Sequence, residues 1–241
     1  FNAQYLNSEI NLNSKYSVTN EKLSGLLFIR NFVIPKKTFN IKKYDIFGGV
    51  GNASIKFESI FKLKAFSELF NNISLNGKML IKNLNIVGFD IKKIIQKIDS
   101  VKSLPDLLNL FGNIESSGSS RVDTVEGEFK VNSGILILDN LVSKNKNLII
   151  KTTGEYDLKS EKFNLNNKIN LKTNSYPNLP SLSIRLFGKP EKFSTKYNFD
   201  EIRKKFLNEG LLKFNSKEIL KIPLKNGKEI DLKNIIEMFS N

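Results

Sequence analysis

The chain has 241 residues, of which 40% are apolar, so it is long enough to bury a core and too apolar for a disordered tail. It contains no Cys, which excludes a thiol nucleophile, a disulfide framework and a thiolate metal site. The absence of His also removes the commonest general base and imidazole ligand, so we expect no enzyme, no catalytic set, no metal site and no cofactor.

The formal net charge of +14 comes almost entirely from Lys. Four of the 38 basic residues are Arg, whereas proteins that read base edges or hold phosphates in bidentate fashion favour Arg. The Lys residues are scattered along the strands beside abundant Asn and Ile, as an AT-rich coding sequence would supply. Two interpretations stay open: a coding bias, or a weak attraction to acidic lipid headgroups.

The first third of the chain alternates apolar and polar residues with period two, which is typical of half-buried strands. The segments with this pattern are 3–5, 10–12, 16–18, 23–29, 51–57 and 73–81. The chain begins at Phe1 inside such a pattern, so we expect its natural N-terminus, with any signal or anchor, to lie upstream. No stretch has the roughly 18 apolar residues of a membrane-spanning helix.

A Gly-rich segment, Gly48-Gly49-Val50-Gly51, resembles a phosphate-binding loop only superficially. No Lys-Ser or Lys-Thr pair follows it, and the next residues have a strand pattern instead of a helical one. We therefore interpret the segment as a sharp turn or bulge.

Helical periodicity begins at 89–98, where the apolar residues lie on one face and Lys-rich positions on the other. Asp90 lies in the first turn, where the helix dipole favours an anion, and we prefer this role to that of a catalytic acid. A second helix, with Pro105 near its start, completes a helix pair near 89–111. Weaker helical patterns lie at 65–70, 200–213 and 230–239.

A Ser/Gly-rich loop at 114–120 separates the helix pair from a central meander at 121–199. It is either a linker or a mobile loop within one domain, and we favour the mobile loop. The meander has strand patterns at 128–132, 135–138, 148–156, 162–166 and 168–172. Polar turns at 133–134, 144–147 and 159–161 separate them. These connections are too short for crossover helices, so the strands are expected to be antiparallel and joined by hairpins.

Five segments follow one another in an order that a known family shares. They are 74–81, 86–91, 126–136, 148–158 and 183–190. Gly88 and Asp90 hold the fixed positions of a strand that leads into a helix, and Gly154, Asp157 and Leu158 those of a later strand. On these residues the chain resembles the AsmA-like C-terminal region, related to the TamB/AsmA-like bridge-type lipid transfer proteins.

The chain departs from the family pattern at 119–121 and in the tail from Ser216 onward, which leaves the subfamily open. The resemblance implies a periplasmic protein of the Gram-negative cell envelope, attached to the inner membrane by an upstream anchor. Members of the family form elongated, curled β-sheets with an apolar concave face. They carry phospholipid toward the outer membrane or support outer-membrane assembly.

Together these features predict a mainly β fold with a few amphipathic helices (α+β). We expect a curled antiparallel sheet that forms an elongated β-groove over residues 1–215, followed by a poorly defined tail at 216–241. The candidate groove-lining residues are Phe163, Leu165, Ile169, Leu171, Leu182, Ile184 and Leu186. The alternative is that these residues form an ordinary core with the amphipathic helices. Lys92, Lys93 and Lys97 are candidates for headgroup contact, with a solvated helix face as the alternative.

The functional hypothesis is a non-enzymatic, lipid-handling protein of the periplasm, with phospholipid as partner and no nucleic acid. One rival is a structural or assembly factor that binds outer-membrane barrel proteins by strand addition at a sheet edge. A second rival is a basic nucleic-acid-binding protein, whose binding would depend steeply on salt.

Overall fold

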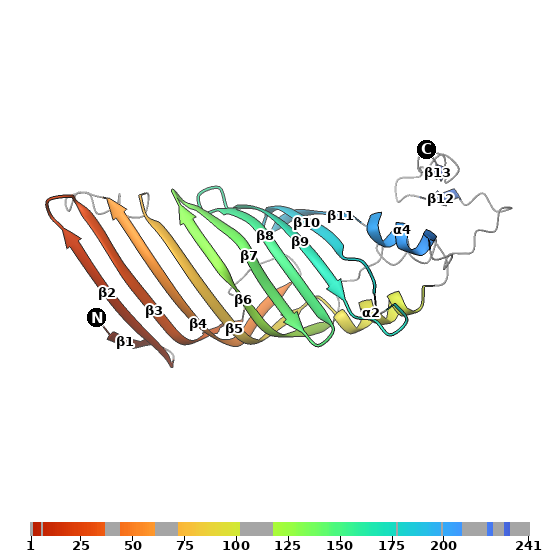
Figure 1. Cartoon of the computed structure of the whole chain (residues 1–241), viewed down its shortest axis with the longest axis horizontal. Coiled ribbons are helices and arrows are strands. Elements are labelled where there is room, and N and C mark those ends of the chain that lie inside the picture. The colour runs from red at the N-terminus through yellow and green to blue at the C-terminus, as the bar shows by residue number, and fades with distance from the viewer. Residues whose placement is uncertain are drawn as a thin grey trace.

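The computed structural model describes residues 2–5, 7–36, 44–60, 72–101, 118–176, 178–198, 200–208, 221–223 and 229–231. Its main element is an antiparallel sheet of 11 strands that lie side by side in the order of the sequence (Figure 1). The strands are β1 (Asn2–Tyr5), β2 (Ser8–Ser17), β3 (Lys22–Ile34), β4 (Asp45–Ile60), β5 (Ser74–Val87), β6 (Ser119–Asn132), β7 (Ile135–Asn145), β8 (Leu148–Asp157), β9 (Lys162–Leu171), β10 (Leu182–Lys189) and β11 (Lys192–Asn198). The predicted antiparallel meander is confirmed.

Two helices and a pair of short strands accompany the sheet in the described part of the chain. Helix α2 (Ile91–Asp99) and helix α4 (Asp200–Asn208) lie near the β11 end of the sheet (Figure 1). Strands β12 (Lys221–Pro223) and β13 (Glu229–Asp231) pair with each other, apart from the large sheet. The large sheet and both helices thus lie within 1–215, and the separate strand pair lies within the tail.

The strand register gathers the apolar residues on one face of the sheet, which we call the inner face. Side chains alternate between the two faces along a strand, so directly paired residues share a face. One row of paired inner residues crosses strands β2 to β10: Leu12, Leu27, Ile55, Gly77, Phe129, Leu138, Gly154, Leu165 and Leu186. The charged residues of the strands lie at the alternate positions, on the outer face.

A contact between two aromatic rings shows that the sheet curls toward its inner face. Tyr44, just before β4, has its ring centroid 6.4 Å from that of Phe193 on β11. Both residues have inner-face parity, since Ile46 pairs with Ile86 and Phe193 pairs with Gly188. In a flat sheet these strands would be about 34 Å apart, seven spacings of about 4.8 Å. The sheet is therefore an elongated groove, and it stays open because β1 and β11 are the two ends of the strand order.

Bulges and left-handed residues bend the long strands. Gly48 and Gly49 have φ values of 72° and 71° inside β4, and the register with β3 shifts beside them. The interpretation of this Gly-rich segment as a bulge or sharp turn is confirmed. Asn83 in β5, with φ of 61°, likewise interrupts the alternation of side chains between the two faces. Ile81 and Leu84 are therefore both buried although they are three residues apart. Such bends re-aim side chains without ending the strand.

Helix α2 covers the inner face where β8, β9 and β10 meet the end of the groove. Its residues Ile91 and Ile98 share one buried cluster with Leu148, Ile169, Leu171 and Leu182 of the strands and with Ile202 of α4. This is the larger of two buried apolar clusters among the described residues; the smaller one, Ile81, Leu84, Val122 and Val125, lies on the inner face of β5 and β6. We call the end of the molecule that carries the larger cluster the covered end.

Hydrogen bonds hold both ends of α2, the first end to β6 and the other to the segment between β9 and β10. The Asp90 carboxylate accepts a hydrogen bond from the Lys93 amide at 3.0 Å, so Asp90 is the N-cap of the helix, one position before the first turn in which it was expected. Ser120 Oγ, at the start of β6, accepts from the Ile91 amide at 2.9 Å. At the other end, the Tyr176 hydroxyl donates to the Val101 carbonyl at 2.8 Å.

Several expected boundaries differ from the structure. Segments 162–166 and 168–172 form one strand, β9, and residues 230–231 belong to β13 instead of a helix. The loop expected at 114–120 is shorter at its end, because β6 begins at Ser119. The expected helices at 65–70 and 104–111 lie outside the described residues.

Candidate functional site

The inner face of the groove is apolar, uncharged and incompletely buried. No charged side chain occupies an inner-row position of the described strands from β2 to β11. The inner residues that are only half-buried include Leu12, Leu27, Ile29, Ile55, Leu75, Met79, Phe129, Leu136, Leu138, Leu141, Ile184 and Leu186. A sheet of this kind normally buries such a face against a second layer. Along most of this groove, the described chain leaves the face accessible.

Glycines and aromatic rings alternate on the inner face and shape the groove wall. A Cβ atom placed on Gly25, Gly51 or Gly77 would lie within 2.6 Å of a Phe ring atom on a neighbouring strand. The rings are those of Phe57, Phe32 and Phe129 respectively. Each ring therefore occupies the space left by a missing side chain, an arrangement that keeps the wall smooth and lets the strands curve.

One polar pair interrupts the apolar rows between β8 and β9. Thr152 and Asn167 are directly paired inner residues, and the Thr152 hydroxyl donates to Asn167 Oδ1 at 2.7 Å. The Asn167 amide in turn donates to the Ile184 carbonyl at 3.2 Å. These bonds satisfy the pair internally, so the polar groups need no ligand partner.

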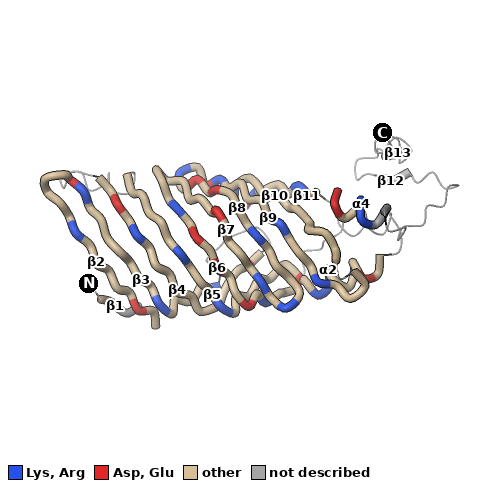
Figure 2. Tube along the Cα trace, viewed as in Figure 1, with Lys and Arg blue, Asp and Glu red and all other residues tan. Residues whose placement is uncertain are grey.

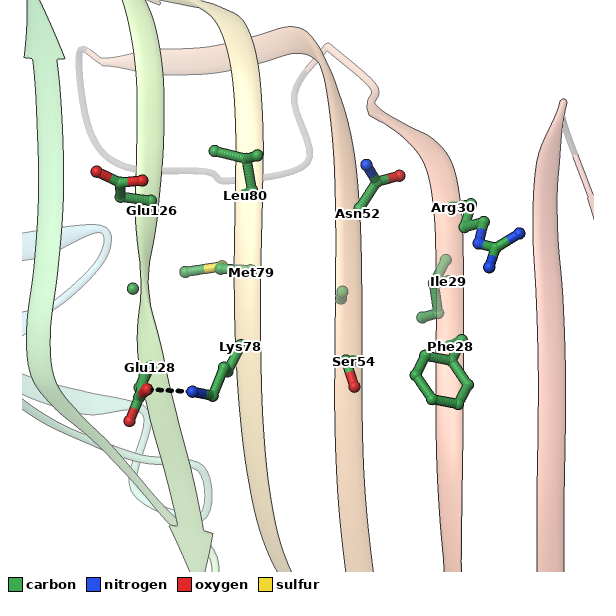
Figure 3. Close-up of a pocket in the computed structure, with 12 residues that line it drawn as sticks. Phe28, Ile29, Arg30, Asn52, Ser54, Lys78, Met79, Leu80, Glu126 and Glu128 are labelled. Carbon is green, nitrogen blue, oxygen red and sulfur yellow. Dashed lines mark ion pairs between the residues drawn. The ribbon is translucent and has the colours of Figure 1, made fainter.

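A shallow hollow of about 520 Å³ crosses strands β3 to β6. It lies on the outer face of the sheet, because eight of its 12 lining residues have outer-face parity, among them Arg30, Lys78 and Glu126 (Figure 3). The Lys78–Glu128 ion pair, with 2.7 Å between Nζ and Oε1, lies beside it. The volume falls in the range of ligand pockets, but the hollow lies opposite the apolar inner face and is not part of the groove.

The seven predicted lining residues all lie on the inner face, in two different environments. Phe163, Leu165 and Leu186 are half-buried and face the groove, and Ile184 is half-buried and packs against the edge of the cluster under α2. Ile169, Leu171 and Leu182 are only 6%, 5% and 4% exposed and pack in the core under α2. For these three residues the structure has the alternative arrangement, a core with an amphipathic helix. Lipid contact by the other four stays a prediction.

The predicted headgroup residues lie on α2. Lys92 is exposed. Lys93 and Lys97 are half-buried, and each already has at least one polar or electrostatic interaction within the protein. Sequence reasoning missed the groove wall of β2 to β7, which includes Leu27, Ile55 and Phe129. Their period-two pattern was visible, but the pattern alone does not tell which face stays open.

The described residues contain no group of three or more side chains suited to hold a metal ion. No helix among them is long and apolar enough to cross a membrane. The chain matches no protein-family model, no curated protein and no solved structure. The resemblance to the AsmA-like region therefore stays a prediction.

Proposed function

We propose that the groove binds the hydrocarbon chains of lipids and that the protein handles lipid without catalysing a reaction. One observation carries the proposal: an uncharged apolar face runs across the sheet, and its residues outside the two buried clusters are mostly only half-buried by the described chain. Monomeric soluble proteins rarely leave so continuous an apolar surface without a partner for it.

Acyl chains fit this surface for a simple physical reason. Each CH₂ group that leaves water gains about 0.8 kcal/mol, and the gain requires no directed bonds. A smooth wall of Leu, Ile and Phe with glycines between them can therefore hold chains of different lengths in different positions. A charged or strongly polar ligand would find no charged partner on the inner rows.

The resemblance to AsmA-like proteins supplies the setting of the proposal. In that setting the protein works in the periplasm, is attached to the inner membrane through an upstream segment, and carries phospholipid toward the outer membrane. The phospholipid headgroup would remain in water at the open side of the groove, while its acyl chains lie along the inner face.

A matched pair of variants tests the groove. Leu27 lies on the inner face and Leu26, the next residue of β3, lies on the outer face and is 42% exposed. Binding of a pyrene-labelled phospholipid is measured by fluorescence for Leu27→Gln and for Leu26→Gln. Burying the added amide beside an acyl chain should weaken binding by Leu27→Gln about tenfold, whereas Leu26→Gln binds as the parent protein does.

A second matched pair of variants tests the groove at β7. In β7, Leu138 lies on the inner face and Ile137 on the outer face. Leu138→Gln should weaken phospholipid binding and Ile137→Gln should not. Equal effects for inner and outer variants at both places, or no phospholipid binding by the parent protein, would refute the groove proposal.

The two edge strands favour a second candidate, an assembly factor for outer-membrane barrel proteins. β1 and β11 each border only one strand of the large sheet, so either edge could accept an added strand. This candidate predicts protein that purifies free of lipid and binds peptides copied from barrel strands. Mass spectrometry of the purified protein separates the candidates, because the lipid-handling proposal predicts co-purified phospholipid.

A further inference from the structure

The outer face of the sheet divides into two electrostatically different parts. Six ion pairs join outer-face side chains of strands β2 to β7, among them Lys78 with Glu128 and Lys144 with Glu126, both at 2.7 Å. Residues 148–198, which include β8 to β11, contain nine Lys and Arg but four Asp and Glu. The basic positions of these strands can be followed in blue in Figure 2.

Four cations on β8 to β11 form a group that we call the basic array: Lys151, Lys168, Arg185 and Lys196. All four are exposed, and none forms an ion pair with a described residue. They come from four consecutive strands, one cation from each. Neighbouring strands are about 4.8 Å apart, so the array spans about 15 Å of surface.

The register places like charges directly opposite each other twice within the basic array. Lys151 of β8 pairs with Lys168 of β9, and Arg185 of β10 pairs with Lys196 of β11. Directly opposed like charges destabilise an antiparallel pair, and sheets normally place opposite charges there. The strands β5 and β6 follow the normal rule, since Lys78 pairs with Glu128. The array therefore costs folding stability that a neutral surface would not.

The neighbours of the array are uncharged hydrogen-bonding groups and one aromatic ring. Arg185 Nε donates to Asn164 Oδ1 at 2.8 Å, and Asn166 is the direct partner of Arg185 in β9. Phe187 lies between two cations, with Arg185 Cζ at 5.6 Å and Lys196 Nζ at 5.5 Å from its ring centroid. The ring holds the two charged groups in place through cation–π contacts and does not neutralise them.

We propose that the basic array binds the anionic headgroups of a membrane surface. Three of its four cations are Lys, which acts as a point charge toward phosphate instead of a geometry-specific fork, as suits a surface of mobile headgroups. A single-stranded nucleic acid would be expected to need a series of stacking aromatic rings, and Phe187 is the one aromatic residue on this face of β8 to β11. The array would hold the covered end against the membrane while the groove on the opposite face stays free.

The test compares two double variants that remove the same charge. Lys168→Gln with Arg185→Gln takes one cation from each like-charge pair. Lys56→Gln with Lys78→Gln takes two cations from β4 and β5, where each has a carboxylate within 4.0 Å. Co-sedimentation is measured with vesicles of phosphatidylcholine alone and with phosphatidylglycerol added, at about 0.1 M salt, where the Debye length is about 10 Å.

The parent protein should bind the phosphatidylglycerol vesicles, and about 1 M salt should abolish this binding. The array variant should bind roughly 30-fold more weakly, about fivefold for each cation removed, and the control variant less than twofold more weakly. The array variant should also unfold at the same or a higher urea concentration, because it relieves two like-charge contacts. A purely structural role predicts the opposite shift.

Three results would overturn the proposal: equal binding to both vesicle types, equal losses in the two double variants, or tighter binding of a single-stranded oligonucleotide that depends on the same residues. The groove variant Leu27→Gln is tested in the same vesicle assay, to separate the two proposals. Because groove and array lie on opposite faces, this variant should keep its vesicle binding, so a failure of either proposal leaves the other testable.

Discussion

The covered end and the open groove use the same apolar inner face in opposite ways. At the covered end, α2 lies on the strands, and Leu148 and Ile98 are only 1% and 2% exposed. On β2 and β3, inner-face residues such as Leu12 and Leu27 remain half-buried. A protein that needed only stability would cover the whole face, because each buried side chain contributes about 1.5–3 kcal/mol.

This difference teaches where stability and binding are separated in the molecule. The covered end supplies the larger buried cluster, whereas the open groove relies on a smaller one on β5 and β6, its neighbouring strands, its Gly–Phe contacts and exposed ion pairs. Exposed ion pairs contribute little, commonly below about 1 kcal/mol each. The open groove therefore keeps a surface that a ligand can complete, and the covered end holds the sheet in its curled form.

Truncating a core residue at the covered end should have the largest effect on stability. Ile98→Ala removes a side chain from the centre of the cluster under α2 and should lower the free energy of unfolding by about 2–5 kcal/mol. Leu27→Ala removes a half-buried side chain and should cost only about 1 kcal/mol. Urea unfolding followed by circular dichroism measures both. Similar losses for the two variants would show that the groove is as well packed as the covered end.

Two glycines sharpen the comparison through the backbone. A Cβ on Gly154 would lie 2.1 Å from the Asn164 carbonyl oxygen, and Gly154 has φ of 140°. Gly154→Ala should therefore cost about 2 kcal/mol or more, because the obstacle is backbone and the conformation disfavours a side chain. Gly77→Ala meets only the far end of the Phe129 ring, at 2.3 Å. This ring can turn into the open groove, so the cost should be smaller.

Thermal unfolding of the two glycine variants provides the measurement. The expected order is parent, Gly77→Ala and Gly154→Ala, from most to least stable. The reverse order would mean that the Phe129 ring is fixed and that the groove wall does not adapt. Phospholipid binding by Gly77→Ala is a second measurement of whether the Phe129 ring moves, because a displaced Phe129 ring narrows the groove.

The sequence predicted the strands and local signals well, because these depend on neighbouring residues. The period-two pattern located the meander, the Ser133-Gly134 turn is present with φ of 49° and 82°, and Asp90 lies at the start of α2, although as its N-cap instead of in its first turn. Asn167 explains one error. A polar residue at an inner position split β9 in the prediction, and the hydrogen bond from Thr152 that makes it acceptable comes from another strand.

The groove itself depended on long-range contacts that a period cannot encode. The curl brings Tyr44 and Phe193 together across the sheet, and no local pattern links residues so far apart. The placement of α2 likewise decides that Ile169 and Leu182 are core while Leu165 and Leu186 face the groove. All four have the same alternating pattern, so their separation follows from tertiary packing alone.

Removing the cap of α2 should have an intermediate effect and should concentrate it at the covered end. Asp90→Ala deletes the acceptor for the Lys93 amide and should cost about 1 kcal/mol. Asp90→Asn retains an acceptor and should recover most of the loss. Hydrogen exchange should be accelerated in α2 and little changed in β2 and β3. Faster exchange throughout the sheet would show that the two regions unfold together.

The smallest expected effect is on the pH dependence of stability. The open groove contributes to the loss of stability at acid pH, and the covered end contributes to the loss at alkaline pH. On the strands of the open groove, hydrogen bonds and charge attraction from Lys22 and Lys78 lower the pKa values of Glu58 and Glu128 respectively. Groups with a lowered pKa stabilise the fold above their unfolded value of 4.5, and this stability is lost as the pH falls below it. Glu128→Gln should therefore flatten the acid limb of a urea-unfolding series.

The alkaline limb belongs partly to the covered end. Burial, and to a smaller extent the Asp99 carboxylate, raise the pKa of Tyr176 above its ordinary value of 10.0. The unfolded chain then ionises first, so stability falls as the pH rises above that value. Tyr176→Phe should reduce the alkaline slope without removing it, because Lys78 and Lys130 also have raised pKa values through their carboxylate partners. Between the limbs the chain has no His to titrate, and stability should stay level from about pH 5 to about pH 9. An alkaline slope unchanged by Tyr176→Phe would mean that folding does not raise the pKa of Tyr176.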